Sequence, residues 1–166
     1  MSITTNRLMK ELNKLSSAKD DVIEVVEDIS TNNFKATSQI IIEIPTDIME
    51  WKLKIKGPSD SPYDKGVFDM LLRFNSDYPF KPPSLKFMKA IYHPNIYRDG
   101  KICIDILQPN DWVSTQTVRT IMLSIISLLC DPNPASPANR EAAELYVKDR
   151  DAYNKKVIES IANLII

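Results

Sequence analysis

Residues 92–107 read YHPNIYRDGKICIDIL, and they contain the most informative cysteine of the chain. The isoleucines at positions 102, 104 and 106 alternate with Cys103, Asp105 and Leu107. Because successive side chains of a strand point to opposite faces, this alternation predicts a strand whose isoleucines lie in the core. Cys103 and Asp105 would then face outward together, although free cysteine is among the most buried residue types. An ordinary half-buried cysteine on a strand fits the same pattern.

The surroundings of Cys103 restrict its chemistry. A cysteine that attacks an unactivated amide needs an imidazole base beside the thiol and a third group to orient that base. The only histidine of the chain, His93, is held between Tyr92 and Pro94. A carboxylate at Asp105 would disfavour the thiolate form of the cysteine. This pattern argues against a protease and favours a carrier thiol, which receives an activated acyl group by thioester exchange.

The same neighbours suit transfer of that acyl group to an amine. The carboxylate of Asp105 could attract a lysine ammonium and help it to lose its proton. The side-chain amide of Asn95 could donate a hydrogen bond to the oxyanion that develops when the amine attacks. Asparagine is also a common turn residue, so a purely structural role for Asn95 stays open.

Hydrophobic patterning in the rest of the chain predicts an α+β fold. Leu8, Leu12 and Leu15 recur at helical spacing near the start, and the pattern is helical again from Ser114 to the end. Between these helical regions, β-strands are expected at residues 39–44, 51–56, 67–74 and 84–87. Helices packed on an antiparallel sheet are the architecture that this order predicts.

Composition and charge exclude several functional classes. A chain of 166 residues is long enough for one compact domain, and its formal net charge of −1 argues against general nucleic-acid binding. The N-terminal sequence lacks an apolar secretory core, and the apolar stretch at 121–129 is too short to span a membrane. Free thiols, rather than a disulfide or a metal site, are expected from two cysteines and one histidine. The cytoplasm or the nucleus is therefore the expected location.

In the segment around Cys103 the chain resembles the ubiquitin-conjugating enzyme family. His93, Pro94 and Asn95 precede Cys103 at the spacing of the family, and four further motifs stand in the family's order. These motifs are GPSDSPY at 57–63, YPFKPP at 78–83, Trp112 and DPNP at 131–134. The resemblance covers nearly the whole chain. It implies a single conjugating domain over residues 1–166, with a four-stranded antiparallel meander and four helices.

The resemblance also implies roles for the residues of the cysteine segment. Cys103 would accept ubiquitin from an activating enzyme as a thioester and, with a ubiquitin ligase, pass it to a lysine of a protein substrate. Asn95 would stabilise the oxyanion or the loop, Asp105 would help to activate lysine, and His93 and Pro94 would be structural. No cofactor or metal is expected, because the activating enzyme consumes the ATP. A carrier for another ubiquitin-like modifier and a non-catalytic ubiquitin-interaction module are the alternatives, and the presence of Cys103 argues against the second.

Partner-binding positions follow from the same resemblance. They are Leu123 and Ser127 for the donor ubiquitin, Phe80 and Ser114 for the ligase, and Arg7 and Lys10 for the activating enzyme. Charge pairing of the kind expected at the two basic residues speeds encounter between proteins. A lone exposed leucine, a core aromatic and solvated charges are the plainer interpretations of Leu123, Phe80 and the basic pair.

The chain departs from the sequence of many family members at two places. Residues 113–115 read VST where SPA is common, so the type of ligase stays open. Ser136 stands at the gate of the active site, where many members have an acidic residue. Serine also occurs there in authentic members, and phosphorylation of this Ser-Pro step would supply the negative charge that favours an approaching ammonium.

Residues 18–38 are expected to be an insertion between the first helix and the first strand of the family's core. Their VIEVV sequence is apolar enough to pack, and either a tolerated surface loop or an added strand fits it. We expect the extension to be ordered and to alter the outer face of the sheet. Related enzymes bind a second, non-covalent ubiquitin on that face, so such binding should be weak or absent.

Overall fold

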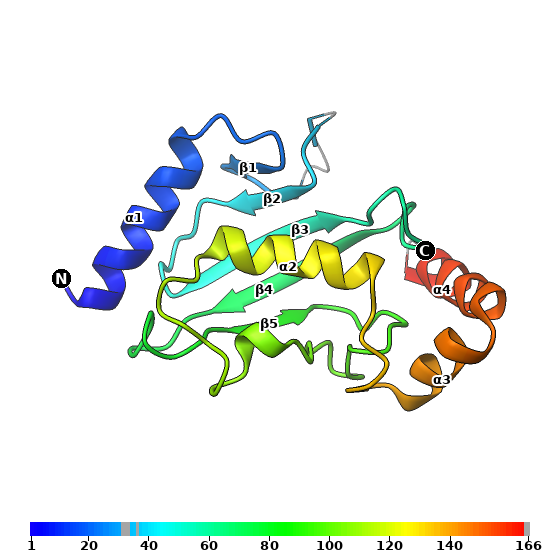
Figure 1. The fold of residues 1–166 in the computed structure, drawn as a ribbon. Helices are drawn as coiled ribbons and strands as arrows, with labels where there is room; N and C mark the ends of the chain where they lie inside the picture. Colours follow the sequence, from blue (N-terminus) through cyan, green and yellow to red (C-terminus); the bar gives the residue numbers. More distant parts are fainter. Residues whose placement is uncertain (31–33, 36, 165–166) are drawn as a thin grey trace.

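The computed structural model describes residues 1–30, 34, 35 and 37–164 (Figure 1). In chain order its elements are α1 (Ile3–Ser17), β1 (Ile23–Val26), β2 (Ile40–Glu43), β3 (Glu50–Lys56), β4 (Val67–Arg73), β5 (Ser84–Phe87), the 3₁₀ helix η1 (Asp105–Leu107), α2 (Val118–Cys130), α3 (Arg140–Lys148) and α4 (Arg150–Leu164). Over the described ranges the chain thus forms the four expected α-helices. The region expected to be helical from Ser114 onward is divided by loops.

One sheet with strand order β1–β2–β3–β4–β5 organises the fold. Strands β2 to β5 pair antiparallel in sequence order, which confirms the expected meander. Residues 23–26 add a fifth strand, β1, parallel to β2, which is one of the two alternatives left open for the extension. The apolar VIEVV sequence explains the addition: Ile23 lies beside Ile40 and Val25 beside Ile42, so the new strand extends the buried face of the sheet.

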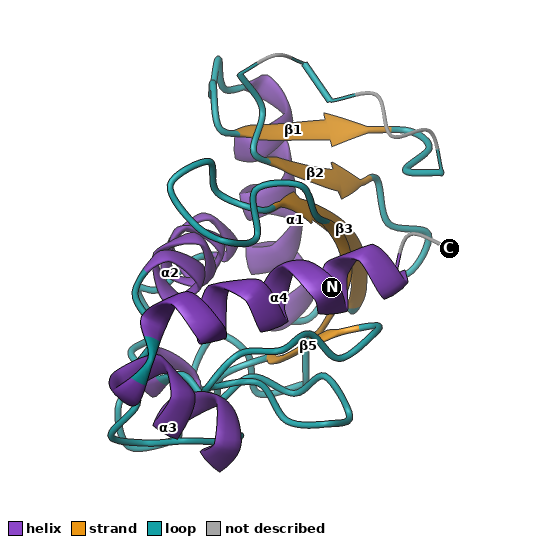
Figure 2. Ribbon diagram, turned by 90° about the vertical axis from the view of Figure 1, so that its right-hand side faces the viewer, coloured by secondary structure: helices purple, strands orange, loops and turns teal. Residues whose placement is uncertain are grey.

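Helix α2 lies against one face of the sheet, while α1 stands at one end and α3 and α4 at the other (Figure 1). Figure 2 shows the same layers from the side, with α4 running across the end of the sheet. The buried residues of α2 recur at helical spacing and are Val118, Ile121, Met122, Ile125 and Leu129. Burial of each such side chain contributes roughly 1.5–3 kcal/mol, so this stripe fixes α2 on the sheet.

A buried carboxylate, Glu11, joins α1 to two other segments. Its Oε1 accepts a hydrogen bond from the backbone N–H of Val118 at 2.8 Å, and its Oε2 accepts from the hydroxyl of Tyr78 and from Arg7 Nε. Burial raises the pKa of Tyr78, and the hydrogen bond to Glu11 raises it further. Because all three donors are satisfied by one side chain, Glu11 sets the position of α1 against the start of α2.

Described residues near both ends of the segment between β1 and β2 are bonded to the sheet. Glu24 on β1 accepts a hydrogen bond from the Ser38 hydroxyl at 3.1 Å, and Glu43 on β2 accepts one from the backbone N–H of Ile29 at 2.9 Å. The two carboxylates thereby hold Ile29 and Ser38, which lie near the two ends of the segment between β1 and β2. Of the insertion expected at 18–38, residues 31–33 and 36 lie outside the described residues.

The outer face of the sheet is the face opposite α2. Its residues alternate with those of the core and include Ile41 on β2, Leu71 on β4 and Lys86 on β5. Ile41 is only 1% exposed, so this face is covered near the extension. Towards β5 the same face is open, because Arg73 and Ser84 are exposed.

Replacing Glu11 with leucine should lower the free energy of unfolding by about 3 kcal/mol. The substitution leaves the Val118 N–H and the Tyr78 hydroxyl buried without an acceptor, and each costs about 1–3 kcal/mol. Urea denaturation measures the loss. Asn13→Ala, at an exposed position of the same helix, is the control and should change stability by less than about 0.5 kcal/mol. A loss for Glu11→Leu no larger than that of the control would contradict the assigned role.

Candidate functional site

Cys103 lies on an irregular segment, not on the strand that the alternation predicts. Residues 101 and 102 form isolated bridges to Lys86 and Ile96, and the 3₁₀ helix η1 begins at Asp105. A 3₁₀ helix has three residues per turn, so a two-residue alternation cannot continue through it. The prediction of a strand through residue 106 was therefore wrong.

The three isoleucines are therefore not all buried, as a strand would have made them. Ile102 is buried, whereas Ile104 and Ile106 are only half-buried. Cys103 is half-exposed with a free thiol, and Asp105 is exposed beside it in sequence. Both expected outward-facing residues are thus accessible, although the backbone that presents them is a turn.

The turn at residues 93–95 holds the cysteine backbone. The N–H of Cys103 donates a hydrogen bond to the Asn95 carbonyl at 2.8 Å, and the N–H of Asn95 donates to Nδ1 of His93 at 2.9 Å. Because Nδ1 accepts, Nε2 carries the proton and donates to the Leu128 carbonyl at 2.8 Å. His93 is fully buried, and burial lowers its pKa to about 4. The imidazole is therefore neutral at pH 7 and has no free nitrogen to act as a base for the thiol.

The side-chain amide of Asn95 holds a second loop, residues 131–139, against this turn. Its Nδ2 donates to the carbonyls of Asn133 at 2.8 Å and Ser136 at 3.0 Å, while its Oδ1 accepts from the Asn133 N–H at 2.8 Å. The Pro94 carbonyl accepts from the N–H groups of Ala138 and Asn139. Asn95 is fully buried, and both of its amide hydrogens are engaged. Donation to an oxyanion would require the loop to release one of them.

These contacts bring together the cysteine segment and the loop that carries Ser136. The Ser136 side chain is exposed, so it is free to meet an incoming group, whereas its backbone is fixed by Asn95. Asp105 is also exposed, and it forms no ion pair with any cation of the described chain. The site thus consists of the half-exposed Cys103 thiol and the loop that Asn95 holds in place. The carboxylate of Asp105 follows the cysteine two residues later in the sequence.

Over residues 1–30, 34, 35 and 37–164, no group of three or more His, Cys, Asp or Glu side chains could hold a metal ion. No described helix is both long and apolar enough to cross a membrane.

Helix α2 presents the two positions expected to contact donor ubiquitin. Leu123 is half-buried and Ser127 is exposed, on turns whose other side packs on the sheet. Cys130, the second thiol, ends the helix and is exposed. Partial burial raises the pKa of Cys130, and the nearby carboxylates of Asp60 and Asp131 add to the effect.

The residues expected to bind the ligase lie on two loops that are tied together. Phe80 is 69% exposed, and the adjacent Pro79 carbonyl accepts a hydrogen bond from Trp112 Nε1 at 2.8 Å. Ser114 is exposed two residues after that tryptophan. The Thr4 hydroxyl of α1 donates to the Tyr78 carbonyl at 2.7 Å, so α1 borders the same area.

The two basic residues of α1 differ in their surroundings. Arg7 donates from Nη2 to the Gln116 carbonyl at 2.9 Å and pairs with Glu11 at 3.0 Å. Lys10 is exposed. Arg7 therefore holds α1 to the loop before α2, and Lys10 is the freer charge for a partner.

Sequence reasoning missed a tyrosine that supports the turn at residues 93–95. The Tyr63 hydroxyl contacts the Tyr92 carbonyl and lies 2.7 Å from the Tyr153 hydroxyl of α4. Burial raises the pKa of Tyr63 well above its ordinary value. The GPSDSPY motif at 57–63 was a signal for this residue, but a motif does not reveal which distant helix its last residue will reach.

Comparison with known proteins agrees with this geometry. The family model described as ubiquitin-conjugating enzyme matches residues 7–161. Ubiquitin-conjugating enzyme E2 3 of Arabidopsis thaliana is 53% identical over 114 residues, which cover 69% of this chain and 75% of that protein. Ubiquitin-conjugating enzyme E2 2 of Saccharomyces cerevisiae is 49% identical over 118 residues, 71% of this chain and 68% of that protein. The chain therefore belongs to the ubiquitin-conjugating enzyme family.

Proposed function

We propose that Cys103 carries ubiquitin as a thioester and transfers it to lysine. In the first step the Cys103 thiolate attacks the thioester carbonyl of ubiquitin on the activating enzyme, whose thiol leaves. In the second step a lysine amine attacks the new thioester, loses a proton and releases the Cys103 thiol. The observation that carries the proposal is a half-exposed thiol whose backbone is fixed to Asn95 and which has no imidazole base. Such a thiol suits exchange between activated acyl groups.

The whole chain, residues 1–166, would act as one conjugating domain, with 18–38 as an insertion in it. Its partners are ubiquitin, an activating enzyme, a ligase and protein substrates, and its place of action is the cytoplasm or the nucleus. The chain itself would need no cofactor, since ATP is used upstream. A panel of modifiers, each with its own activating enzyme, distinguishes ubiquitin from the alternative of a related modifier.

Asn95 and Ser136 would act in the lysine step. The three hydrogen bonds of the Asn95 side chain support loop bracing as its resting role, and one of its amide hydrogens would turn to the oxyanion as the loop moves. The exposed Ser136 would border the path of the lysine, where a phosphate would favour the ammonium. Asp105 would supply the carboxylate that attracts that ammonium.

The remaining assignments concern partners. Leu123 and Ser127 would hold the donor ubiquitin along α2, which their positions on that helix support. Phe80 and Ser114 would anchor the ligase, because an exposed aromatic in a proline-stiffened loop loses little entropy on binding. Lys10, with Arg7 beside it, would dock the activating enzyme.

The extension would weaken non-covalent ubiquitin binding on the outer face. The hydrogen bonds of Glu24 and Glu43 to Ser38 and Ile29, together with the buried Ile41, support this proposal.

Mixing the protein with ATP, activating enzyme and ubiquitin should give a reductant-sensitive adduct at Cys103. Cys103→Ser should give a reductant-resistant oxyester, because the hydroxyl forms an ester, and Cys103→Ala should give no adduct. Non-reducing gels followed by reduction measure both. Cys130→Ser is the matched control for the second thiol and should be charged like the wild type. An adduct that still forms in Cys103→Ala would contradict the assignment of Cys103 as the thioester residue.

Asn95→Ala should spare charging and slow discharge to free lysine by about tenfold to a thousandfold, the range for loss of one oxyanion donor. Thioester exchange builds up less oxyanion character than aminolysis, so only the second step should suffer. Single-turnover charging and discharge measure the two steps separately. Asn163→Ala, at an exposed position near the end of α4, is the control and should keep both rates. If the two rates fell together in Asn95→Ala, the residue would act only through folding of the loop.

The neutral state of His93 makes stability depend on pH. The pKa of His93 is about 4 in the folded chain and ordinarily about 6.5, so between these values the unfolded chain binds a proton that the folded chain does not. Its contribution to stability is therefore complete above pH 6.5 and is lost as the pH falls. His93 is the only histidine, so no other imidazole contributes in this window.

The free energy of unfolding should fall by about 2 kcal/mol between pH 7 and pH 5. Urea denaturation at a series of pH values measures the fall. In His93→Gln, which can still donate to the Leu128 carbonyl, the dependence over this window should largely disappear. An equal pH dependence in the variant would show that His93 is not the group responsible.

A further inference from the structure

A groove with a volume of about 520 Å³ adjoins the turn at residues 93–95 that holds the cysteine backbone. Residues 90–92, 96–98 and 138–141 line it. We call it the arginine groove, after Arg98 and Arg140, which come from two of these three segments. None of the side chains in these segments has a part in the proposed acyl transfer.

The arginine groove begins close to the thiol. Ile96, in its lining, forms an antiparallel bridge with Ile102, the residue before Cys103. Residues opposite each other in such a bridge have Cα atoms about 4.5–5.5 Å apart. Ala138, in the lining contributed by the other loop, follows Ser136 by two residues. A substrate segment whose lysine reaches Cys103 therefore passes the mouth of the groove.

The spacing of an extended chain decides which substrate residues reach the groove. Such a chain advances about 3.3 Å per residue, so residues about two to four positions from the lysine lie roughly 7–13 Å from it. Residues at these positions are near enough to enter the groove while the lysine is at the thioester.

The arginine groove carries positive charge that its neighbours do not neutralise. Arg98 and Arg140 are exposed, and neither forms an ion pair with a carboxylate of residues 1–30, 34, 35 or 37–164. Glu141 is the one acidic residue among the described residues that line the groove, and it pairs with Lys156. Asp99, next to Arg98 in sequence, does not line the groove. Both guanidinium groups are therefore available to an acidic ligand.

The chemistry of the lining suits a carboxylate on a peptide. A guanidinium group presents its N–H donors as a planar fork that matches the two oxygens of a carboxylate. Two aromatic rings also line the groove, Tyr97, which is 46% exposed, and Tyr92, which is half-buried. Apolar parts of a bound segment can pack on these rings, so the groove fits an acidic side chain with an apolar neighbour.

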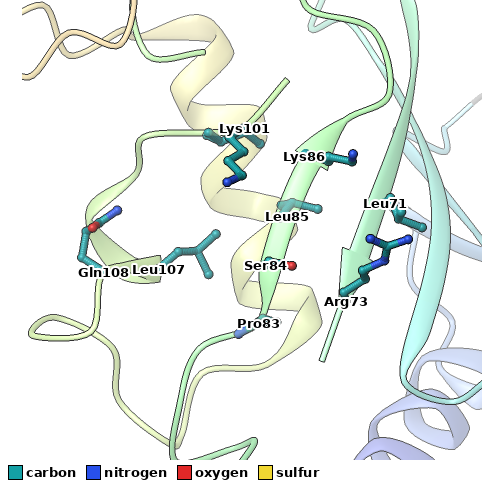
Figure 3. A pocket seen from close by; sticks show the side chains of 10 residues that line it. Leu71, Arg73, Pro83, Ser84, Leu85, Lys86, Lys101, Leu107 and Gln108 are labelled. Atoms are coloured by element: carbon teal, nitrogen blue, oxygen red, sulfur yellow. The ribbon is translucent and has the colours of Figure 1, made fainter. Parts of the chain in front are cut away.

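A second cationic groove, along β5, offers a matched comparison (Figure 3). Arg73, Lys86 and Lys101 line it, and Lys86 and Lys101 lie opposite each other in an antiparallel bridge. It shares no lining residue with the arginine groove and none with the 131–139 loop that carries Ser136. The arginine groove is therefore the one that borders both loops of the site.

We propose that the arginine groove selects protein substrates that have an acidic residue about two to four positions from the lysine that receives the acyl group. The carboxylate pairs with Arg98 and Arg140, and an apolar neighbour lies against Tyr97. This inference rests on the proposed function, because it names the substrates of the same site. The two arginines determine specificity and touch no reacting atom.

The first measurement needs neither ubiquitin nor ATP. A nine-residue peptide with a central lysine and glutamates two and three positions from it is titrated into the uncharged protein, and ¹⁵N spectra follow binding. The amide signals of Tyr97, Arg98 and Arg140 should shift. The Kd should be at least about threefold lower than for the same peptide with glutamines, since each exposed charge pair contributes modestly.

The second measurement charges the protein with ubiquitin and follows single-turnover discharge onto the same peptides. Below saturation the glutamate peptide should be modified at least about threefold faster than the glutamine peptide, through a lower KM. Glutamates on the N-terminal and C-terminal sides of the lysine are tested separately, and a preference on either side supports the proposal. Added salt should reduce the preference, because exposed charges are screened.

Three double variants locate the preference. Arg98→Glu/Arg140→Glu should abolish it in both measurements, while discharge to free lysine should not fall. Arg98→Lys/Arg140→Lys keeps the charge and should keep most of the preference. Lys86→Glu/Lys101→Glu makes the same change in net charge in the groove along β5 and should also keep most of it. Circular dichroism checks that each variant is folded.

Equal Kd values and equal discharge rates for the glutamate and glutamine peptides would overturn the proposal. A preference lost in Lys86→Glu/Lys101→Glu but kept in Arg98→Glu/Arg140→Glu would also overturn it, because the groove along β5 would then be the site. Normal charging without any preference would refute this inference alone. A lower Kd for the glutamate peptide, with shifts at both arginines but no thioester, would uphold acid recognition by the groove and refute the carrier function.

Discussion

The whole site depends on the hydrogen bonds of one buried residue, Asn95. Polar groups in a protein interior need hydrogen-bond partners, and Asn95 finds its partners in the segments that form the site. Its three hydrogen bonds fix the 131–139 loop, and its backbone carbonyl fixes Cys103. A fully buried asparagine cannot move without leaving donors and acceptors unpaired on both sides, at a cost of about 1–3 kcal/mol each. The position of Cys103 relative to the 131–139 loop therefore follows from one residue.

Helix α2 connects this site to the opposite end of the molecule. The first backbone N–H of α2, at Val118, donates to Glu11, and near its other end the Leu128 carbonyl accepts from His93. The helix is thus tied at one end to the area around Phe80 and at the other to the turn that carries Asn95. A rigid element bonded at both ends keeps a fixed separation between the partner-binding area and the thiol.

The sequence predicted the meander and the four helices because alternation and helical spacing reflect burial on one face, which local patterns record. It failed where burial depends on distant segments. The isoleucines after Cys103 alternate as in a strand, yet no neighbouring strand continues beside them, so a 3₁₀ turn forms instead. β1 was left open because its apolar residues suited either a loop or an edge strand. The network of Glu11 could not be foreseen, since its partners lie up to 107 residues away.

The hydrogen-bonded imidazole of His93 bears on how readily water could hydrolyse a thioester on this protein. A thioester in water is exposed to hydrolysis, and hydrolysis is fastest when a base removes a proton from the attacking water. His93 cannot serve, because both of its nitrogens are occupied and its ring is neutral within the core. An amine is a better nucleophile than water and needs less assistance. The fold thus denies an attacking water the general-base help of an imidazole.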